Sequence, residues 1–160
     1  MNPRKYNKIL VTGSNGFVGK ALCKTLRNKG NNYVGSVRNK ALVEKDQDFI
    51  IVENLNKNTD WRKALDGCDT VVHLAARAHI LNDNIDDPLE AFRLTNTHGT
   101  LNLAEQAVEC GVSRFIFLSS IGVNGSVTSG IPFCYNDIPS PHSPYSISKL
   151  EVDKIIINYV

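Results

Sequence analysis

Short apolar runs alternate with longer segments of helical periodicity along most of the chain. The five runs expected to form strands cover residues 8–12, 33–37, 49–52, 70–74 and 114–118. They are continuous apolar stretches, which is typical of parallel strands covered on both faces, whereas strands with one solvated face alternate. With helical patterns between the strands, the order predicts an α/β fold: a Rossmann-like, doubly wound parallel sheet with helices on both faces.

The helical segments have recognisable ends. Apolar residues recur at helical spacing from Phe17, and Gly30 is expected to end that helix. Asp87 and Pro88 are a cap and a first-turn proline for a long helix that closes at Gly111. Its expected buried stripe is Leu94, Leu101, Ala104 and Val108. A short helix over 61–65, a loop rich in Gly, Ser and Pro over 122–143, and a last helix over 145–157 complete the prediction.

Composition narrows the class of protein. The chain has 160 residues, 42% of them hydrophobic and 21% charged, which fits one globular domain over 1–160. A net charge of +2 gives no reason to expect nucleic acid as a partner, and no apolar run approaches the ~20 residues that span a membrane. Four scattered cysteines without metal-ligand spacing predict a reducing cytoplasm, no metal and no disulfide.

Three glycines follow the first strand in a G-x-x-G-x-x-G arrangement that opens the first helix. Glycine permits a tight turn and a close backbone approach, and the amides of a helix N-terminus attract phosphate. The order strand, glycines, helix therefore predicts a dinucleotide-binding loop, with an ordinary strand–helix connection as the alternative. The residues expected to contact the cofactor here are Gly13, Asn15, Gly16, Phe17, Val18 and Gly19.

Arg38 follows the second strand, where this fold places the group that recognises the adenine ribose. A carboxylate there binds a free 2′-hydroxyl, whereas an arginine accommodates a 2′-phosphate. No carboxylate stands at this strand end, so the cofactor is expected to be NADP or NAD, with NADP preferred. A solvated arginine without a cofactor contact is the alternative.

Tyr145 and Lys149 are one helical turn apart, so they share one face of the last helix. A free phenol has a pKa of roughly 10, and a neighbouring ammonium favours the phenolate and lowers that value. Such a tyrosine takes a proton from an alcohol or gives one to a ketone. Taken alone, the pair also fits an ordinary surface helix.

Together these motifs resemble the extended short-chain dehydrogenase/reductases, specifically the NAD-dependent epimerase/dehydratase group that acts on nucleotide sugars. The similarity covers residues 8–157 and includes the loop from Thr12 to Gly19 and the N-x-x-G-T pattern that begins at Asn96. It implies an NAD(P)-binding Rossmann domain, in which Asn54 stands where members have an aspartate beside the adenine. The resemblance adds these residues to the expected cofactor site: Asn54, Leu55, Leu74, Ala75, Ala76, Asn96, Tyr145 and Lys149.

The resemblance also implies a catalytic trio. Ser120, at the end of the fifth strand, takes the place of the residue that hydrogen-bonds the reacting oxygen. Tyr145 takes the place of the proton donor and acceptor, and Lys149 that of the residue that tunes Tyr145 and holds the nicotinamide ribose.

The reaction class follows in part from what stands after Ser120. Members that carry out 4,6-dehydration have an Asp-Glu pair there, whereas this chain has Ile121 and Gly122, which offer no acid or base for elimination. The resemblance therefore favours 4-epimerisation or reduction of a 4-keto sugar, with a UDP-linked sugar as substrate. His79 is expected in a loop near the cleft, and Trp61 in the core.

Members of the family build their sugar site from residues after the tyrosine–lysine helix, and the sequence ends at Val160. We therefore expect a C-terminally truncated domain in which the fifth strand has an unpaired edge. Such an edge favours self-association, so a homo-oligomer is predicted. A catalytically inactive dinucleotide-binding fragment or interaction module is the alternative to an enzyme.

Overall fold

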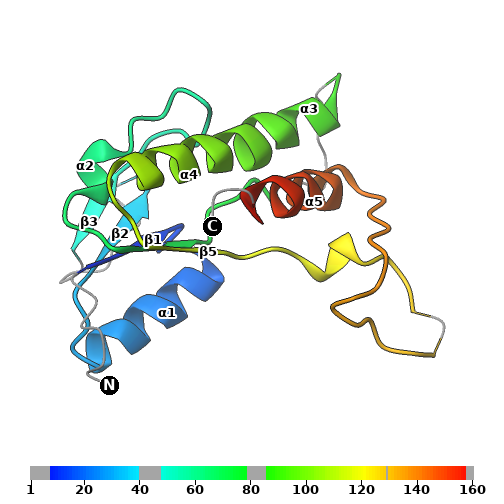
Figure 1. Cartoon of the computed structure of the whole chain (residues 1–160), viewed down its shortest axis with the longest axis horizontal. Coiled ribbons are helices and arrows are strands. Elements are labelled where there is room, and N and C mark those ends of the chain that lie inside the picture. The colour runs from blue at the N-terminus through cyan, green and yellow to red at the C-terminus, as the bar shows by residue number, and fades with distance from the viewer. Residues whose placement is uncertain (1–7, 40–47, 79–85, 129, 158–160) are drawn as a thin grey trace.

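The structure is a computed structural model that describes residues 8–39, 48–78, 86–128 and 130–157. Its centre is a parallel five-stranded sheet in the order β3-β2-β1-β4-β5 (Figure 1). The strands are β1 (Ile9–Thr12), β2 (Tyr33–Val37), β3 (Phe49–Ile51), β4 (Thr70–His73) and β5 (Arg114–Phe117). The sequence predicted all five, and each boundary lies within one residue of the prediction.

Helices cover both faces of this sheet, as a doubly wound fold requires. α1 (Phe17–Asn28) lies on one face, whereas α2 (Arg62–Leu65), α4 (Gly99–Glu109) and α5 (Pro144–Ile156) lie on the other (Figure 1). None of the helices in the described ranges is long and apolar enough to cross a membrane.

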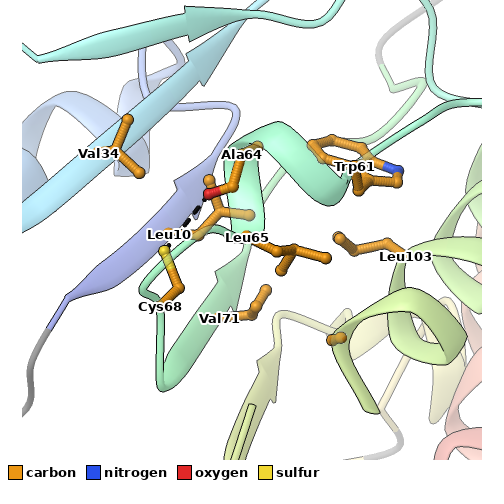
Figure 2. Close-up of a cluster of buried hydrophobic side chains, with 9 residues drawn as sticks. Leu10, Val34, Trp61, Ala64, Leu65, Cys68, Val71 and Leu103 are labelled. Atoms are coloured by element: carbon orange, nitrogen blue, oxygen red, sulfur yellow. Dashed lines mark hydrogen bonds between the residues drawn. The ribbon is translucent and has the colours of Figure 1, made fainter. Parts of the chain in front are cut away.

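The larger of two hydrophobic clusters lies between the sheet and α2 and α4. Figure 2 shows its side chains converging from β1, β2 and β4 and from the two helices. Trp61 is 1% exposed in this cluster, which confirms its predicted packing role. A smaller cluster under α1 contains Val11, Cys23 and Tyr33.

The predicted long helix contains a wider turn. It runs as α3 (Pro88–Phe92), a π-helical segment η2 (Arg93–His98) and α4. As expected, the Asp87 side chain caps its start by accepting from the Glu90 amide at 3.0 Å. Gly111 follows its end at φ +78°, a conformation that glycine adopts without strain.

The predicted buried stripe of that helix is wrong at two positions. Leu94 and Val108 are 45% and 56% exposed, and the buried face of α4 is instead formed by Thr100, Leu103, Ala104 and Ala107. The polar residue Thr100 can belong to this buried face because its hydroxyl is hydrogen-bonded to His73 inside the protein. A stripe read from hydrophobicity alone gives such residues too little weight.

Candidate active site

A cavity of about 560 Å³ lies at the carboxyl ends of β1, β2, β3 and β4. This is the edge at which open parallel sheets bind their ligands. Nine residues predicted from the sequence as cofactor contacts line it: Gly13, Asn15, Gly16, Arg38, Asn54, Leu55, Leu74, Ala75 and Ala76. The lining also includes residues that the sequence did not predict as cofactor contacts: Ser36, Val37, Val52, Trp61, Arg77, Ala78 and Thr95.

The glycine loop turns tightly against its own helix and against β4. Gly13 has φ +64°, and a Cβ there would lie 2.9 Å from the Cα of Ala75. A Cβ at Gly19 would lie 2.2 Å from the Gly13 carbonyl oxygen, which is closer than any real contact. The N-cap of α1 is Gly16, with no side-chain hydrogen bond to the first turn. The loop thus presents helix amides to the cavity, the arrangement that binds phosphate.

Two other residues of the predicted loop lie apart from the cavity lining. Phe17 is 96% exposed and Val18 is 47% exposed, both in the first turn of α1. Gly19 is buried and packs against the Gly13 backbone, so its contribution is to the shape of the loop.

Arg38 is exposed at the rim of the cavity, one residue after β2. The strand end before it is fixed to the glycine loop, since both the amide and the hydroxyl of Ser14 donate to the carbonyl of Ser36, at 3.3 and 3.1 Å. These two hydrogen bonds to Ser36 therefore hold the backbone near Arg38 in place relative to the glycine loop.

Asn96 is 1% exposed and connects the cavity to α5. Its side-chain oxygen accepts from the Arg77 amide at 2.8 Å, and its Nδ2 donates to the Arg77 carbonyl at 3.1 Å and to the Ser148 hydroxyl at 3.0 Å. The Asn96 side chain thus holds one residue of the cavity wall and one residue of the helix that carries Tyr145 and Lys149. It lies behind the lining instead of on it.

The three predicted catalytic residues come together next to this cavity. The Ser120 hydroxyl accepts from the Gly122 amide at 3.1 Å, at the start of the short helix η3 (Ile121–Val123), and hydrogen-bonds the side chain of Tyr145. Phe92 links the trio to the cavity wall, because its ring contacts Tyr145 edge-on and lies under the guanidinium of Arg77, which lines the cavity.

Local sequence fixes the start of α5 and therefore the place of Tyr145. Ser143 and Ser146 form a reciprocal capping box around Pro144, the first residue of the helix. Tyr145 is the next residue, so its side chain leaves the helix at the end that faces Ser120.

The pKa of Tyr145 departs from the prediction made from the sequence. Burial raises it above its ordinary value, and the Ser120 hydrogen bond offsets only part of that effect. The predicted lowering by Lys149 is absent because the Lys149 Nζ lies 6.0 Å from the centroid of the Tyr145 ring and only 4.0 Å from that of Phe117. In this state of the protein Tyr145 is a protonated phenol, suited to donating its proton.

Lys149 is a buried cation, 3% exposed. Burial lowers its pKa to about 8, and the charge of Asp153 one turn further along α5 partly offsets this. Asp153 itself accepts a hydrogen bond from the Ser119 hydroxyl at 2.5 Å. The segment just after β5 is thus hydrogen-bonded to α5 at two points: Ser120 to Tyr145, and Ser119 to Asp153.

Replacing Lys149 with methionine is expected to stabilise the folded chain. A folded-state pKa of about 8, below the ordinary 10.5, means that folding disfavours the charged form. The cost is fully present below about pH 8 and disappears as the pH rises through 10.5. We expect Lys149→Met to raise the free energy of unfolding by about 2 kcal/mol at pH 7 and by much less at about pH 10, measured by urea denaturation.

The matched control is Lys154→Met, since Lys154 is exposed on the same helix. It is expected to change stability by less than about 0.5 kcal/mol at both pH values. An equal gain from the two substitutions, or a gain from Lys149→Met that persists at the higher pH, would contradict this account of Lys149.

His98 is exposed on η2. His79, expected in a loop near the cleft, lies outside the described residues.

Known proteins resemble this chain in sequence and in structure. Residues 9–160 match the NAD dependent epimerase/dehydratase family. A UDP-glucose 4-epimerase from Vibrio cholerae is 44% identical over 93% of this chain, and a dTDP-glucose 4,6-dehydratase from Streptomyces griseus is 31% identical over 93%. The structure of the Thermus thermophilus UDP-glucose 4-epimerase in complex with NAD superposes on 95% of this chain with a TM-score of 0.79 at 26% identity.

The matched regions are parts of longer proteins. This chain covers 46% of the Vibrio cholerae relative, 48% of the Streptomyces griseus relative and 50% of the Thermus thermophilus chain, so it spans about half the length of each. The family match begins at residue 9, and the fold is shared with the Thermus thermophilus structure. The glycine loop and the tyrosine–lysine helix lie within the matched residues. The chain belongs to the NAD dependent epimerase/dehydratase family.

Proposed function

We propose that this chain binds a nicotinamide dinucleotide and forms the cofactor-binding part of a nucleotide-sugar oxidoreductase that acts at sugar C4, as a 4-epimerase or a 4-keto reductase. The observation that carries this proposal is the adjacency of two features. A cavity lined by the glycine loop lies beside a hydrogen-bonded Ser120–Tyr145 pair with a buried lysine. The NAD bound to the Thermus thermophilus relative supports the choice of cofactor.

The residues around the cavity fit each part of a dinucleotide. The loop from Gly13 to Gly16 has the close packing and helix amides that suit a pyrophosphate. Arg38 at the rim suits the adenine ribose, and Asn54 with Leu55 suits the adenine. The wall formed by residues 74–76 follows His73, whose ring stacks on Phe117, and the Lys149 ammonium lies over that phenylalanine ring. Tyr145 and Lys149 would hold the nicotinamide ribose.

The chemistry that the nicotinamide would supply when bound is donation or acceptance of the hydride at sugar C4. The chain's own part is to move the proton and to hold the oxygen. As a protonated phenol, Tyr145 would give its proton to a 4-keto oxygen. In the reverse direction its phenolate would take the proton of a 4-hydroxyl. The Ser120 hydroxyl would hold that oxygen, and Lys149 would contact the nicotinamide ribose.

The residues after Ser120 argue against 4,6-dehydration by this chain. That reaction needs an acid and a base to remove water from the sugar. Neither isoleucine nor glycine has a titratable side chain. Ile121 is 69% exposed, and the Gly122 amide donates to the Ser120 hydroxyl. Relatives include both a 4-epimerase and a 4,6-dehydratase, and a UDP-linked sugar is the substrate we favour.

Arg38 is expected to favour NADP over NAD. Its guanidinium at the cavity rim suits a 2′-phosphate, and a charge-assisted contact of this kind contributes roughly 1.5–3 kcal/mol. Arg38→Ala should therefore raise the Kd for NADP by roughly ten- to a hundredfold and change that for NAD less than about twofold, in titrations followed by calorimetry. Tighter binding of NAD than of NADP by the unsubstituted chain would contradict the preference for NADP.

Turnover tests the proposed reaction. The test compares this chain with a chimera in which the C-terminal half of the Vibrio cholerae relative follows residue 157. Both are incubated with a panel of UDP-sugars and 4-keto sugars. We expect the chimera to epimerise or reduce at C4. Dinucleotide binding without turnover by the chimera would favour the alternative, an inactive binding module.

The open edge of the sheet predicts self-association. Among the described strands β5 pairs only with β4, and Ile116 on it and Leu118 just after it are each 46% exposed. An apolar strand without a neighbour readily pairs with another copy. We expect a homo-oligomer by analytical ultracentrifugation that Ile116→Lys converts to monomer, whereas Val127→Lys, in the exposed loop after η3, has no effect. A monomeric parent chain at high concentration would contradict this proposal.

A further inference from the structure

His73 is the only fully buried histidine in the described ranges, with no exposed surface at the carboxyl end of β4. Strand register places it opposite Thr12, the last residue of β1. Its Nδ1 lies 2.6 Å from the Thr12 hydroxyl, and its Nε2 lies 2.8 Å from the hydroxyl of Thr100 on α4. One imidazole thus joins two central strands to the helix that covers them.

The protons in this chain of contacts have one consistent arrangement. The Thr12 hydroxyl oxygen accepts from the backbone amides of Leu74 and Ala75, both at 3.1 Å. With both lone pairs engaged, the hydroxyl donates its own proton to the Nδ1 of His73. The Nδ1 therefore carries no proton, and the Nε2 donates to Thr100. The imidazole is neutral in this arrangement.

The surroundings of His73 keep it neutral. Phe117 stacks on its ring at 6.0 Å between centroids, and Phe115 lies at 6.1 Å, both from β5. Burial, together with the nearby charge of Lys149 on α5, lowers its pKa to about 3. At neutral pH the proton arrangement above is thus the stable one.

The two amides that Thr12 holds belong to the wall of the cavity. Leu74, Ala75 and Gly13, the residue after Thr12, all line it. The Cα of Ala75 lies so close to Gly13 that a Cβ on Gly13 would be 2.9 Å away. The Thr12 hydroxyl therefore fixes the contact between the glycine loop and the β4 wall.

We propose that His73 is a positioning residue for the dinucleotide site: by accepting the Thr12 hydrogen bond through Nδ1, it directs the Thr12 oxygen at the Leu74 and Ala75 amides and so sets how the glycine loop packs against the β4 wall of the cavity. This inference rests on the proposed dinucleotide binding. In this proposal the contact of Nδ1 with Thr12 supports ligand affinity, and the contact of Nε2 with Thr100 holds α4 on the sheet.

Two substitutions of nearly equal size separate this role from simple packing. In His73→Asn an amide oxygen takes the approximate place of Nδ1, so an acceptor for Thr12 remains. In His73→Leu none remains. We expect His73→Leu to raise the Kd for the preferred dinucleotide about tenfold, and His73→Asn to raise it less than about threefold. Because a buried asparagine is only partly satisfied here, His73→Asn should unfold at the same or a lower temperature than His73→Leu.

Affinity and stability are thus expected to move in opposite directions, which a purely structural role would not produce. Thr100→Val, which cuts the other contact of the ring, should lower the melting temperature and leave the Kd within about twofold. If the three variants lose affinity in the same order as they lose stability, the inference is overturned while the proposed function stands. If the unsubstituted chain binds neither dinucleotide, the proposed function is overturned and this inference with it.

A second readout does not depend on any ligand. Nitrogen-15 NMR of the chain without cofactor at neutral pH should show His73 as the neutral tautomer with its proton on Nε2. The tautomer with the proton on Nδ1, or an imidazolium, would overturn the proton arrangement on which the inference stands.

Discussion

Tyr145→Phe should lower the kcat of the chimera by a factor of about 10² to 10⁴, because in the proposed reaction the Tyr145 hydroxyl is the group that transfers the proton to the sugar oxygen. Phenylalanine keeps the edge-on contact with Phe92, so the fold around the site is expected to stay as it is. The loss should therefore appear in kcat, with the Kd for the dinucleotide changed less than about threefold, as measured by steady-state turnover and calorimetry.

Tyr135→Phe provides the matched control. Tyr135 is fully exposed in the loop before α5, so the same loss of a hydroxyl there should leave kcat unchanged. A chimera whose rate survives Tyr145→Phe within about threefold would show that the proton comes from another group, and the proposed roles of the trio would be wrong.

Gly19→Ala should weaken dinucleotide binding and destabilise the chain. A Cβ at this position would lie 2.2 Å from the Gly13 carbonyl oxygen and 2.8 Å from the Cα of Ser14, and these are backbone atoms that cannot move alone. The loop must therefore open. We expect a loss of about 2–3 kcal/mol in the free energy of unfolding and a Kd at least roughly tenfold higher, measured by urea denaturation and by calorimetry.

Gly30→Ala separates the loop from the general cost of replacing a glycine. Gly30 follows α1 at φ +66°, and a Cβ there would have no atom within 4 Å, so the substitution costs only backbone strain of about 1 kcal/mol. Its Kd should equal that of the unsubstituted chain. Gly19→Ala with unchanged affinity would show that the close packing of the loop is not needed for binding.

The sheet was predictable from the sequence because its strands lie between layers of helices. Such strands are continuous apolar runs, so β2 (Tyr33–Val37) and β4 (Thr70–His73) stand out by composition alone. The glycine loop was predictable for a different reason, since its backbone approach excludes any side chain at Gly13 and Gly19. In both cases one local requirement dictates the residue type.

Other features depend on neighbours that are distant in the sequence. The buried face of α4 includes Thr100, and no periodicity shows that His73 is its partner. The pKa of Tyr145 is raised because burial outweighs the Ser120 hydrogen bond, whereas spacing alone suggested that Lys149 would lower it. The role we assign to His73 likewise depends on strand register.

Several lining residues were missed for a geometric reason. Ser36, Val37 and Val52 lie at or just after the ends of β2 and β3, and they reach the cavity because the carboxyl ends of parallel strands meet at one edge. The sequence located these strands, so taking the last two residues of each predicted strand as candidates would have found them.

Calorimetric titration of this chain with NAD and with NADP is the most direct test of dinucleotide binding. We expect one saturable site per chain, with affinity reduced in Gly19→Ala and retained in Gly30→Ala. Absence of binding by both dinucleotides, or equal binding by the Gly19→Ala variant, would contradict the claim that this cavity is a dinucleotide site.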